Sequence, residues 1–225
     1  MHIAIIPARS GSKRIKNKNI KKFINEPIIS KTIKIIKKFE IFDKIYVSTN
    51  SNTIKKIAEK SGAIAPFLRD KKLSGDTVIT HDVIIDLIKK TNSKDVLTVT
   101  CLYPTSVFIQ KKYILEALGL LKKNPKKYVF SATKYEHPIQ RAFSIHKNKT
   151  KLYKKYTLKT RTQDFISYYH DAAQFYVANK KTWLSSMLNF GRNGLAIKID
   201  TNKVQDIDYP NDWKLAEIKF KTKEN

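Results

Sequence analysis

The amino-acid sequence predicts an α/β fold in which helices flank a mostly parallel sheet. Apolar runs of strand length alternate with amphipathic segments of helical period through residue 134. One of these runs, residues 95–102, is almost continuously apolar, which is typical of a strand buried on both faces. Strands that alternate with helices favour βαβ units with right-handed crossovers, and therefore a parallel sheet.

The elements of this alternating region can be placed from their patterns. We expect strands at residues 2–7, 44–49, 95–102 and 127–133. We expect helices at residues 28–39, 52–62, 78–90 and 111–123. The second of these helices has Ser51 or Asn52 as its N-cap and Gly62 at its end.

The alternation stops after residue 134. Residues 135–170 are rich in aromatic and hydroxyl side chains without a helical period, so we expect an excursion, such as a hairpin, that reaches a partner subunit. Beyond it we expect strands at 172–179 and 194–200, and helices at 180–188 and 210–221. No internal repeat or linker rich in Pro, Gly or Ser interrupts the chain, which we interpret as a single domain over residues 1–225.

The net charge of +26 comes mainly from lysine, since only six of the 45 basic residues are arginine. The lysines are spread along the whole chain and are often paired. A nucleic-acid-binding protein typically gathers its charge on one face and reads bases with arginine, so this distribution favours solvated helix surfaces. Because arginine is rare, each arginine is a candidate functional residue.

Cysteine content and hydropathy narrow the class of protein further. Cys101 is the only cysteine, which excludes a disulfide framework and a thiolate metal cage and favours a reducing cytoplasm. No run of eighteen apolar residues predicts a membrane span, and the first ten residues resemble a strand more than a signal peptide. We therefore expect a cytoplasmic protein.

A polar loop, "ARSGSKRIKNKN" at residues 8–19, follows the first strand. Ligands of open α/β sheets bind at the carboxyl ends of the strands, so this loop is a candidate anion site. Gly11 allows a tight turn whose backbone N–H groups can form an anion nest, and the cationic side chains can close over phosphates. The loop does not match GxxxxGK[ST] or GxGxxG, and a solvated basic turn is the alternative.

Two carboxylates, Asp206 and Asp208, lie two residues apart near the C-terminus. In an extended segment they point the same way, so both can bind one hard cation such as Mg²⁺ and leave coordination sites for phosphate oxygens. The alternative is that Asp208 caps the helix that begins at Pro210. Both roles can hold together.

Residues 5–29 resemble the N-terminal motif of the CMP-sialic acid synthetase family, nucleotidyltransferases that activate sugar acids with CTP. That motif has an apolar strand, then Ala-Arg-x-x-Ser-Lys-x-x-x-x-Lys-Asn, then a proline before the first long helix, and Pro27 fits the last position. The resemblance implies a Rossmann-like nucleotidyltransferase sheet in which Arg9 and Lys18 hold the triphosphate. The nucleotide-binding residues that it implies in this loop are Ala8, Arg9, Ser10, Gly11, Ser12, Lys18 and Asn19.

The segment "FLRDKKLSGD" resembles the family's LRPxxLAxD, with Arg69 and Asp76 in matching positions. The resemblance implies that Arg69 and the loop backbone around Gly75 and Asp76 read the cytosine. Asp70 stands where proline is usual, which changes the loop geometry.

Two further segments resemble the sugar-acid side of the family's site. "CLYPTSVFI" resembles LQPTSP and carries Tyr103 in place of Gln, with Thr105 and Ser106 in the motif, which implies a different nonulosonic acid from sialic acid. "TRTQD" and "YYHDAAQFY" resemble the branch of the family that acts on pseudaminic acid. Packing is the alternative role for the histidine of this segment. Its implied contacts to the sugar acid are Arg161, Gln163, His170, Asp171 and Gln174.

The resemblance therefore implies a cytidylyltransferase that joins CTP to a nonulosonic acid, in particular pseudaminic acid, and releases pyrophosphate. Arg9, Lys18, Asp206 and Asp208 are the implied catalytic residues, with Mg²⁺ on the two aspartates and a homodimer as the assembly. Sialic, legionaminic or a keto-deoxy sugar acid are alternative substrates. A basic nucleic-acid-binding protein and a catalytically inactive, interaction-only paralogue are the alternatives from other classes.

Overall fold

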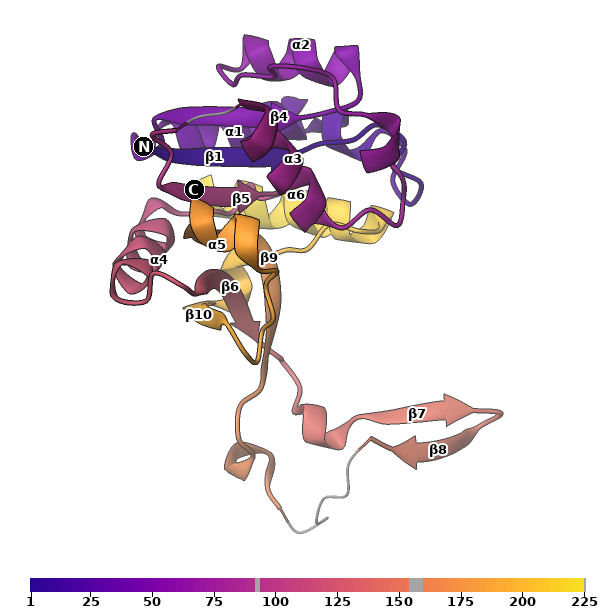
Figure 1. Cartoon of the computed structure of the whole chain (residues 1–225). Helices are drawn as coiled ribbons and strands as arrows, with labels where there is room; N and C mark the ends of the chain where they lie inside the picture. The colour runs from indigo at the N-terminus through magenta and orange to yellow at the C-terminus, as the bar shows by residue number, and fades with distance from the viewer. Residues whose placement is uncertain (92–93, 154–159, 225) are drawn as a thin grey trace.

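A computed structural model of the chain describes residues 1–91, 94–153 and 160–224. It has a layered α/β body from which a long arm extends (Figure 1). The body is built on one six-stranded sheet in the order β10-β6-β9-β5-β1-β4. Its strands are β1 (His2–Pro7), β4 (Lys44–Ser48), β5 (Thr98–Leu102), β6 (Tyr128–Lys134), β9 (Tyr169–Asn179) and β10 (Gly194–Ile199).

The predicted parallel sheet is confirmed, with one antiparallel strand at its centre. β1 pairs in parallel with β4 and β5, and β10 pairs in parallel with β6. β9 joins these two parallel groups, because it pairs antiparallel with β5 on one side and with β6 on the other. The chain reaches β9 from the arm, not through a crossover helix, and this route reverses the strand's direction.

Helices cover both faces of the sheet because successive side chains of each strand point to opposite faces. Ala4 and Ile6 of β1 pack in a core with α1 (Ile28–Lys37), α2 (Asn52–Lys60) and α4 (Lys111–Lys123). Ile3 and Ile5 pack in a second core with α3 (Thr80–Thr91) and α5 (Lys180–Ser185). The alternating side chains of "HIAIIP" thus contribute to the cores on both faces of the sheet.

The last helix, α6 (Pro210–Glu224), contributes to a third apolar cluster, which also includes Ile15 of the loop after β1. Its Trp213 and Phe220 pack edge-on against Phe23. Phe23 belongs to a small hairpin of β2 (Lys22–Phe23) and β3 (Glu26–Pro27). This cluster fixes the segment before α6, which carries Asp206 and Asp208, next to the loop that follows β1.

Several predicted boundaries were too wide. β5 begins at Thr98 instead of residue 95, because the preceding segment is a turn in which Leu97 is 69% exposed. α3 begins at Thr80 instead of residue 78, and α5 ends at Ser185 instead of residue 188. Ser51 is the N-cap of α2, since its Oγ accepts a hydrogen bond from the Ile54 N–H at 3.4 Å.

The predicted excursion is an arm, which we define as residues 135–153 and 160–168; residues 154–159 of the excursion lie outside the described residues. Its main element is an antiparallel hairpin of β7 (Phe143–His146) and β8 (Lys149–Leu152). The turn residues Lys147 and Asn148 both have positive φ, as a two-residue type I′ turn requires. The arm leaves the body as a pair of adjacent segments, because the Tyr135 N–H donates to the Tyr168 carbonyl.

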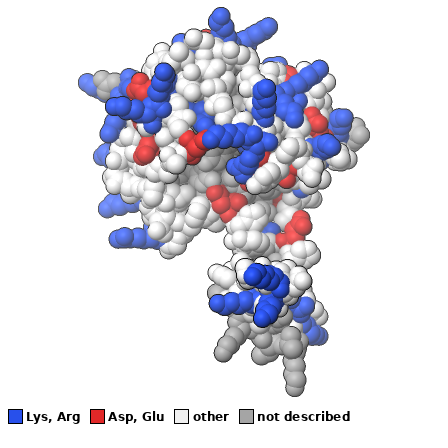
Figure 2. All heavy atoms as spheres, turned by 90° about the vertical axis from the view of Figure 1, so that its right-hand side faces the viewer, with Lys and Arg blue, Asp and Glu red and all other residues white. Residues whose placement is uncertain are grey.

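Charge is spread over the face that Figure 2 shows, which lies at the carboxyl ends of the parallel strands. Lysine and arginine side chains occur across this face, and acidic side chains lie among them near the middle of the body. Within the described part of the chain, no helix has both the length and the apolar character needed to cross a lipid bilayer.

Candidate nucleotide and sugar-acid site

A polar cavity of about 370 Å³ lies at the carboxyl ends of β1 and β5. Five segments contribute to it: the loop after β1, residues 69–83, the turn after β5, Ala173 of β9, and the segment before α6. Parallel neighbouring strands end at the same edge of a sheet, so their following loops converge there. The sequence-predicted residues that line the cavity are Arg9, Ser12, Lys18, Asn19, Arg69, Gly75, Asp76, Tyr103, Thr105, Asp206 and Asp208.

Hydrogen bonds at both ends fix the shape of the loop after β1. The Ala8 N–H donates to the Ser48 carbonyl at 2.9 Å, which extends the pairing of β1 with β4. Asn19 is buried, and its Nδ2 donates to the Arg9 carbonyl at 2.9 Å, which closes the loop into a ring. Gly11 has a φ of 82°, a conformation that glycine adopts without steric cost.

The remaining predicted loop residues support this shape. Ser10 donates from its N–H and Oγ to Asn50 Oδ1 at 2.9 and 3.2 Å. Ala8 is fully buried and packs in the core of the body. Ala8, Ser10 and Gly11 therefore shape the loop, while Ser12 lines the cavity itself.

Two cations of the loop share one carboxylate. Arg9 and Lys13 each form an ion pair of 2.6 Å with Asp76, on opposite oxygens. The hydrogen bond from Lys13, followed by that from Arg9, lowers the pKa of Asp76. All three side chains are partly exposed, so these pairs can exchange for an incoming anion without uncovering a buried charge.

Arg69 is the buried cation of the site, with only 5% of its surface exposed. Its backbone N–H donates to the Thr49 carbonyl at 2.7 Å, and its Nε donates to Ser74 Oγ at 3.4 Å. Burial and the nearby Arg9 guanidinium lower the pKa of Arg69 to about 10. Two neighbouring cations, one of them desolvated, create a site that an anion stabilises.

The segment before α6 brings Asp208 against two cations of the loop. Arg14 Nη1 lies 2.7 Å from Asp208 Oδ2, and Lys18 Nζ lies 3.2 Å from Oδ1. Lys18 also donates to the Ile207 carbonyl at 2.7 Å. The start of α6 is capped by Asp212, which accepts from the N–H groups of the two residues before Pro210, so the Asp208 carboxylate stays directed at the loop.

Asp206 and Asp208 fit a divalent cation. Asp206 is accessible at the cavity rim, yet partial burial of its carboxylate, followed by the charge of Asp208, raises its pKa. A cation between the two carboxylates relieves this repulsion. Within the described residues no group of three or more His, Cys, Asp and Glu could hold a metal, so the protein would supply two carboxylate ligands here. The remaining ligands would be phosphate oxygens and water, as Mg²⁺ prefers.

The turn after β5 forms the wall opposite the loop. Tyr103 donates or accepts a hydrogen bond of 3.2 Å with Thr80 Oγ1, and burial raises the pKa of Tyr103 to about 12, so it stays neutral. Ser106 is buried and internal to the turn, since its Oγ accepts from the Tyr103 N–H and donates to the Gln174 carbonyl. Thr105 faces the cavity, while Ser106 holds the turn against β9.

A second cavity of about 390 Å³ adjoins the first, and Asp206 lines both. His170 and Asp171 line this second cavity. The His170 ring packs against Tyr135 in a tilted arrangement with ring centroids 4.8 Å apart, in keeping with the packing alternative. Gln174 is buried, and its Nε2 donates to the Lys203 carbonyl at 2.9 Å.

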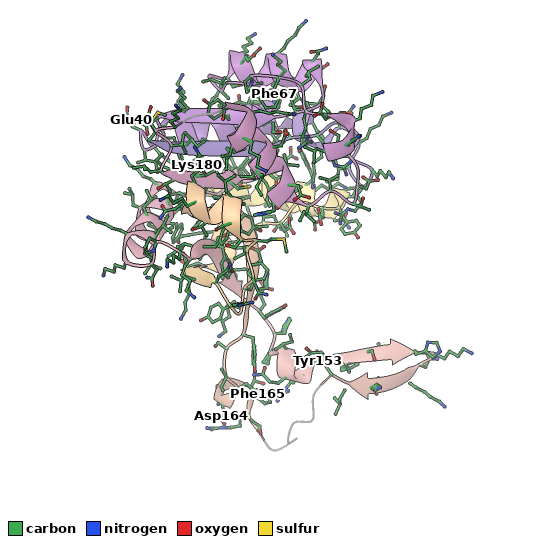
Figure 3. All side chains as sticks on the ribbon, in the orientation of Figure 1. Glu40, Phe67, Tyr153, Asp164, Phe165 and Lys180 are labelled. Carbon is green, nitrogen blue, oxygen red and sulfur yellow. The ribbon has the colours of Figure 1, made fainter. Side chains whose placement is uncertain are left out.

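The arm carries the two remaining predicted residues away from both cavities. Arg161 forms an ion pair with Asp164 of the arm at 2.9 Å. Gln163 lines a small cavity between the two segments of the arm. In Figure 3, Asp164 and Phe165 lie far below the sheet. A role for Arg161 and Gln163 in substrate binding therefore stays a prediction that depends on a second subunit.

Several cavity residues were not predicted from the sequence. Lys13 and Arg14 both line the cavity. Lysine is so common in this chain that nothing distinguished Lys13, whereas the rarity of arginine was the available signal for Arg14. Thr80, which bonds Tyr103, and Ala173, which lies in β9, had no sequence signal because only folding brings them to the turn after β5.

Comparisons with known proteins agree with this geometry. The family model described as Cytidylyltransferase matches residues 3–217. The chain is 37% identical to the pseudaminic acid cytidylyltransferase of Campylobacter jejuni over 98% of this chain and 96% of that one. It is 33% identical to the N-acylneuraminate cytidylyltransferase of Escherichia coli O18:K1:H7, over 99% of this chain and 52% of that one.

A solved structure of CMP:2-keto-3-deoxy-manno-octonic acid synthetase, complexed with CTP, has the same fold. Its TM-score is 0.73 at 13% identity, and the match covers 100% of this chain and 99% of that chain. The similarity therefore extends to the arrangement of the whole body. The family match over residues 3–217 and the 37% identity to the C. jejuni protein show that this chain belongs to the cytidylyltransferase family.

Proposed function

We propose that this cytidylyltransferase transfers CMP from CTP to pseudaminic acid and releases pyrophosphate. The observation that carries the proposal is the single cavity in which Arg9 and Arg69 face the paired carboxylates Asp206 and Asp208. The C. jejuni relative, whose name states this activity, matches the chain from end to end. The same cavity provides cationic groups for a triphosphate and a carboxylate pair for a cation.

The cations of the loop would bind the triphosphate by exchanging partners. Arg9 and Lys13 are held by Asp76, and Arg14 and Lys18 by Asp208. A triphosphate carries more charge than either carboxylate and offers bidentate oxygens to each guanidinium. Arg69 lies deeper in the cavity and is the group that we assign to the cytosine edge, which presents acceptors at O2 and N3.

The reaction we propose is a displacement at the α-phosphorus. The anomeric hydroxyl oxygen of the sugar acid forms a bond to this phosphorus, the bond from phosphorus to the β-phosphate oxygen breaks, and the hydroxyl proton is released. An anionic sugar acid must approach a polyanion, and negative charge grows on the pyrophosphate. Arg9, Arg14 and Lys18 are positioned to stabilise that charge, and no side chain is assigned as a general base.

Asp206 and Asp208 are the residues that we assign to Mg²⁺. The ion would supply Lewis-acid stabilisation of the phosphate oxygens. The carboxylates themselves then have two tasks: they hold the cation at the cavity rim, and Asp208 keeps Arg14 and Lys18 close to it.

We place the sugar acid near the junction of the two cavities, beside Asp206 and Tyr103. Tyr103 offers a neutral hydroxyl, which suits a substrate hydroxyl or acetamido group better than its carboxylate. The carboxylate requires a cation, and Arg161 of the arm is a candidate only if the arm of a second subunit reaches the site. The sugar-acid site is thus the part of the proposal that depends on assembly.

The arm supports a homodimer as the assembly. It leaves apolar side chains exposed, with Phe143 53% and Ile145 67% exposed. Figure 3 shows Tyr153 at the base of the hairpin, far from the body. An extended hairpin with exposed apolar side chains is stabilised when a second copy covers it.

A side-by-side assay of sugar acids tests the proposed substrate. Pyrophosphate release would be measured with CTP and Mg²⁺ and, in separate reactions, pseudaminic, sialic, legionaminic and keto-deoxy sugar acids. We expect kcat/KM to be highest for pseudaminic acid by at least about tenfold, because Tyr103 replaces the glutamine of the sialic acid motif. A higher value for sialic acid would favour the function in the name of the E. coli relative.

A further inference from the structure

Strand β9 contains a strained residue beside the nucleotide cavity. Its pairing with β6 shifts between Phe130 and Ala132, so that residues 172–175 of β9 bulge out of the ladder. Within this bulge Ala173 has a φ of 50°, in the left-handed region. A residue with a Cβ atom adopts this conformation only where its surroundings impose it. Ala173 lines the cavity, so the strain lies at the proposed site.

Asp171 provides the contacts that impose the conformation. One carboxylate oxygen accepts a hydrogen bond of 2.9 Å from the Ala173 N–H. The other accepts a short hydrogen bond from the Tyr176 hydroxyl. Ser131 of the neighbouring strand accepts from the N–H groups of Gln174 and Phe175. Three backbone N–H groups of the bulge thus donate to side chains, and each Asp171 oxygen accepts a hydrogen bond from within the protein.

The second bond of Asp171 leads to the wall of the cavity. The Tyr176 ring packs edge-on against Tyr103, with ring centroids 6.0 Å apart. Tyr103 in turn bonds Thr80 of α3 at 3.2 Å. Asp171 therefore fixes two parts of the cavity: the Ala173 backbone directly, and the Tyr103 side chain through Tyr176.

We propose that Asp171 is a positioning residue, which shapes the cavity by holding Ala173 in the left-handed conformation, and not a direct contact to the sugar acid. This inference rests on the proposed function, since the cavity it shapes is the one assigned to CTP and the sugar acid. It also predicts a specific form of rescue. A glycine at position 173 adopts positive φ without the steric cost, so it needs Asp171 less.

A double-mutant cycle between positions 171 and 173 tests the proposal. Asp171→Ala should raise KM for the sugar acid about tenfold, while kcat at saturation falls less. The same substitution in the Ala173→Gly background should raise KM less than about threefold. Asp171→Asn, which keeps an acceptor for the Ala173 N–H and a partner for Tyr176, should retain most of the wild-type KM.

Tyr176→Phe separates the two hydrogen bonds of Asp171, one to Ala173 and one to Tyr176. It removes the hydroxyl that joins Tyr176 to Asp171 but keeps the ring that packs on Tyr103. The bond from Asp171 to the Ala173 N–H remains, so Ala173→Gly should not offset its effect. An equal KM increase for Asp171→Ala in both backgrounds would contradict the proposal and favour a direct contact. If Asp171→Ala alone fails to fold, the proposal requires that Asp171→Ala with Ala173→Gly folds, and failure of that double variant contradicts it.

Urea unfolding of wild type, Asp171→Ala, Ala173→Gly and the double variant keeps this inference separate from the proposed function. The cycle in unfolding midpoint needs no substrate and should show the same rescue by Ala173→Gly. If wild type releases no pyrophosphate from CTP and pseudaminic acid, the proposed function fails, and the stability cycle alone decides whether Asp171 holds Ala173. If turnover occurs and neither cycle shows coupling, only the positioning role fails.

Discussion

The loop at residues 8–19 and the arm are both excursions from the same sheet, but they follow different paths. The loop folds back on the body, where Arg9 and Lys13 bond Asp76, and Arg14 bonds Asp208. The arm extends away and leaves side chains such as Ile145 exposed (Figure 1). The contacts of the loop come from its own chain, whereas we propose that a second copy covers the exposed apolar side chains of the arm. We therefore expect chemistry and nucleotide binding to depend on the first region, and assembly to depend on the second.

Removal of the paired carboxylates should have the largest effect. Asp206→Asn and Asp208→Asn should each lower kcat by about 10³-fold, because each removes charge that holds a cation beside the reacting phosphate. Pyrophosphate release at saturating CTP and Mg²⁺ measures this. Asp200→Asn is the matched control, since Asp200 is exposed, pairs with Lys203 and lies outside the cavity. Undiminished turnover of Asp206→Asn would overturn the metal assignment.

The arm should control assembly without controlling nucleotide binding. Phe143 and Ile145 lie two residues apart and so share one face of the hairpin. Changing both to serine removes about 1.5–3 kcal/mol of apolar burial per side chain, so the dimer dissociation constant should rise at least about 100-fold. Light scattering over a dilution series measures the change.

The same variant sharpens the contrast with the loop. Its affinity for CTP should stay within about twofold of wild type, while its turnover of the sugar acid falls if the partner's arm completes that site. Lys149→Ser, on the facing strand of the hairpin, is the control that changes exposed charge and not apolar surface. A dimer that survives the loss of both apolar side chains would show that the arm does not form the interface.

The cations of the cavity should set CTP affinity. Arg9→Ala and Arg69→Ala should each weaken CTP binding about 50-fold, because each removes charge-assisted hydrogen bonds to the nucleotide. Titration calorimetry with CTP measures the dissociation constant. Arg192→Ala is the control, because Arg192 is exposed and lies outside the cavity. Equal weakening by all three substitutions would mean that overall charge, and not the cavity, attracts CTP.

His2, at the amino end of β1 and away from the cavity, should affect the free energy of unfolding and not CTP binding. His2 bonds Thr100 Oγ1 at 2.7 Å and the Ile41 carbonyl at 3.1 Å, and burial lowers the pKa of His2 to about 4. The unfolded chain therefore binds a proton more readily, and stability present above pH 6.5 is lost as pH falls toward 4.

This loss can be isolated by substitution. Between pH 7.5 and 5 the His2 contribution should fall by about 2 kcal/mol in the free energy of unfolding. His2→Gln should remove that part of the pH dependence in urea unfolding and leave CTP affinity at pH 7.5 unchanged. A pH slope that is the same in both proteins would contradict the assignment to His2.

The sequence predicted the loop far better than the arm, and the reason is physical. Arg9, Lys18 and Asn19 act within one short segment whose strand, turn and cations are local features. Asp206 and Asp208 were proposed from their spacing of two together with the presence of the loop motif in the same chain, since the spacing alone is weak evidence. The antiparallel direction of β9 was not predictable, since it results from the path of the chain through the arm.

Contacts between distant segments account for what the sequence left open. Ala173 and Thr80 reach the cavity only because β9 lies beside β5 and α3 begins beside Tyr103. Asp171 was predicted as a sugar-acid contact from its position in a motif, and only the folded chain shows both of its oxygens bonded to Ala173 and Tyr176. Motifs identify which side chains matter, while packing decides what each of them touches.

Phosphorus NMR of the complete reaction tests the central claim most directly, namely that this cavity joins CMP to pseudaminic acid. Wild-type protein would be incubated with CTP, Mg²⁺ and pseudaminic acid, and the same mixture would be prepared with Asp206→Asn. We expect the three CTP signals to be replaced by one phosphodiester signal and the pyrophosphate signal with wild type only. Unchanged CTP with wild type, or release of free CMP in place of the diester, would contradict the account.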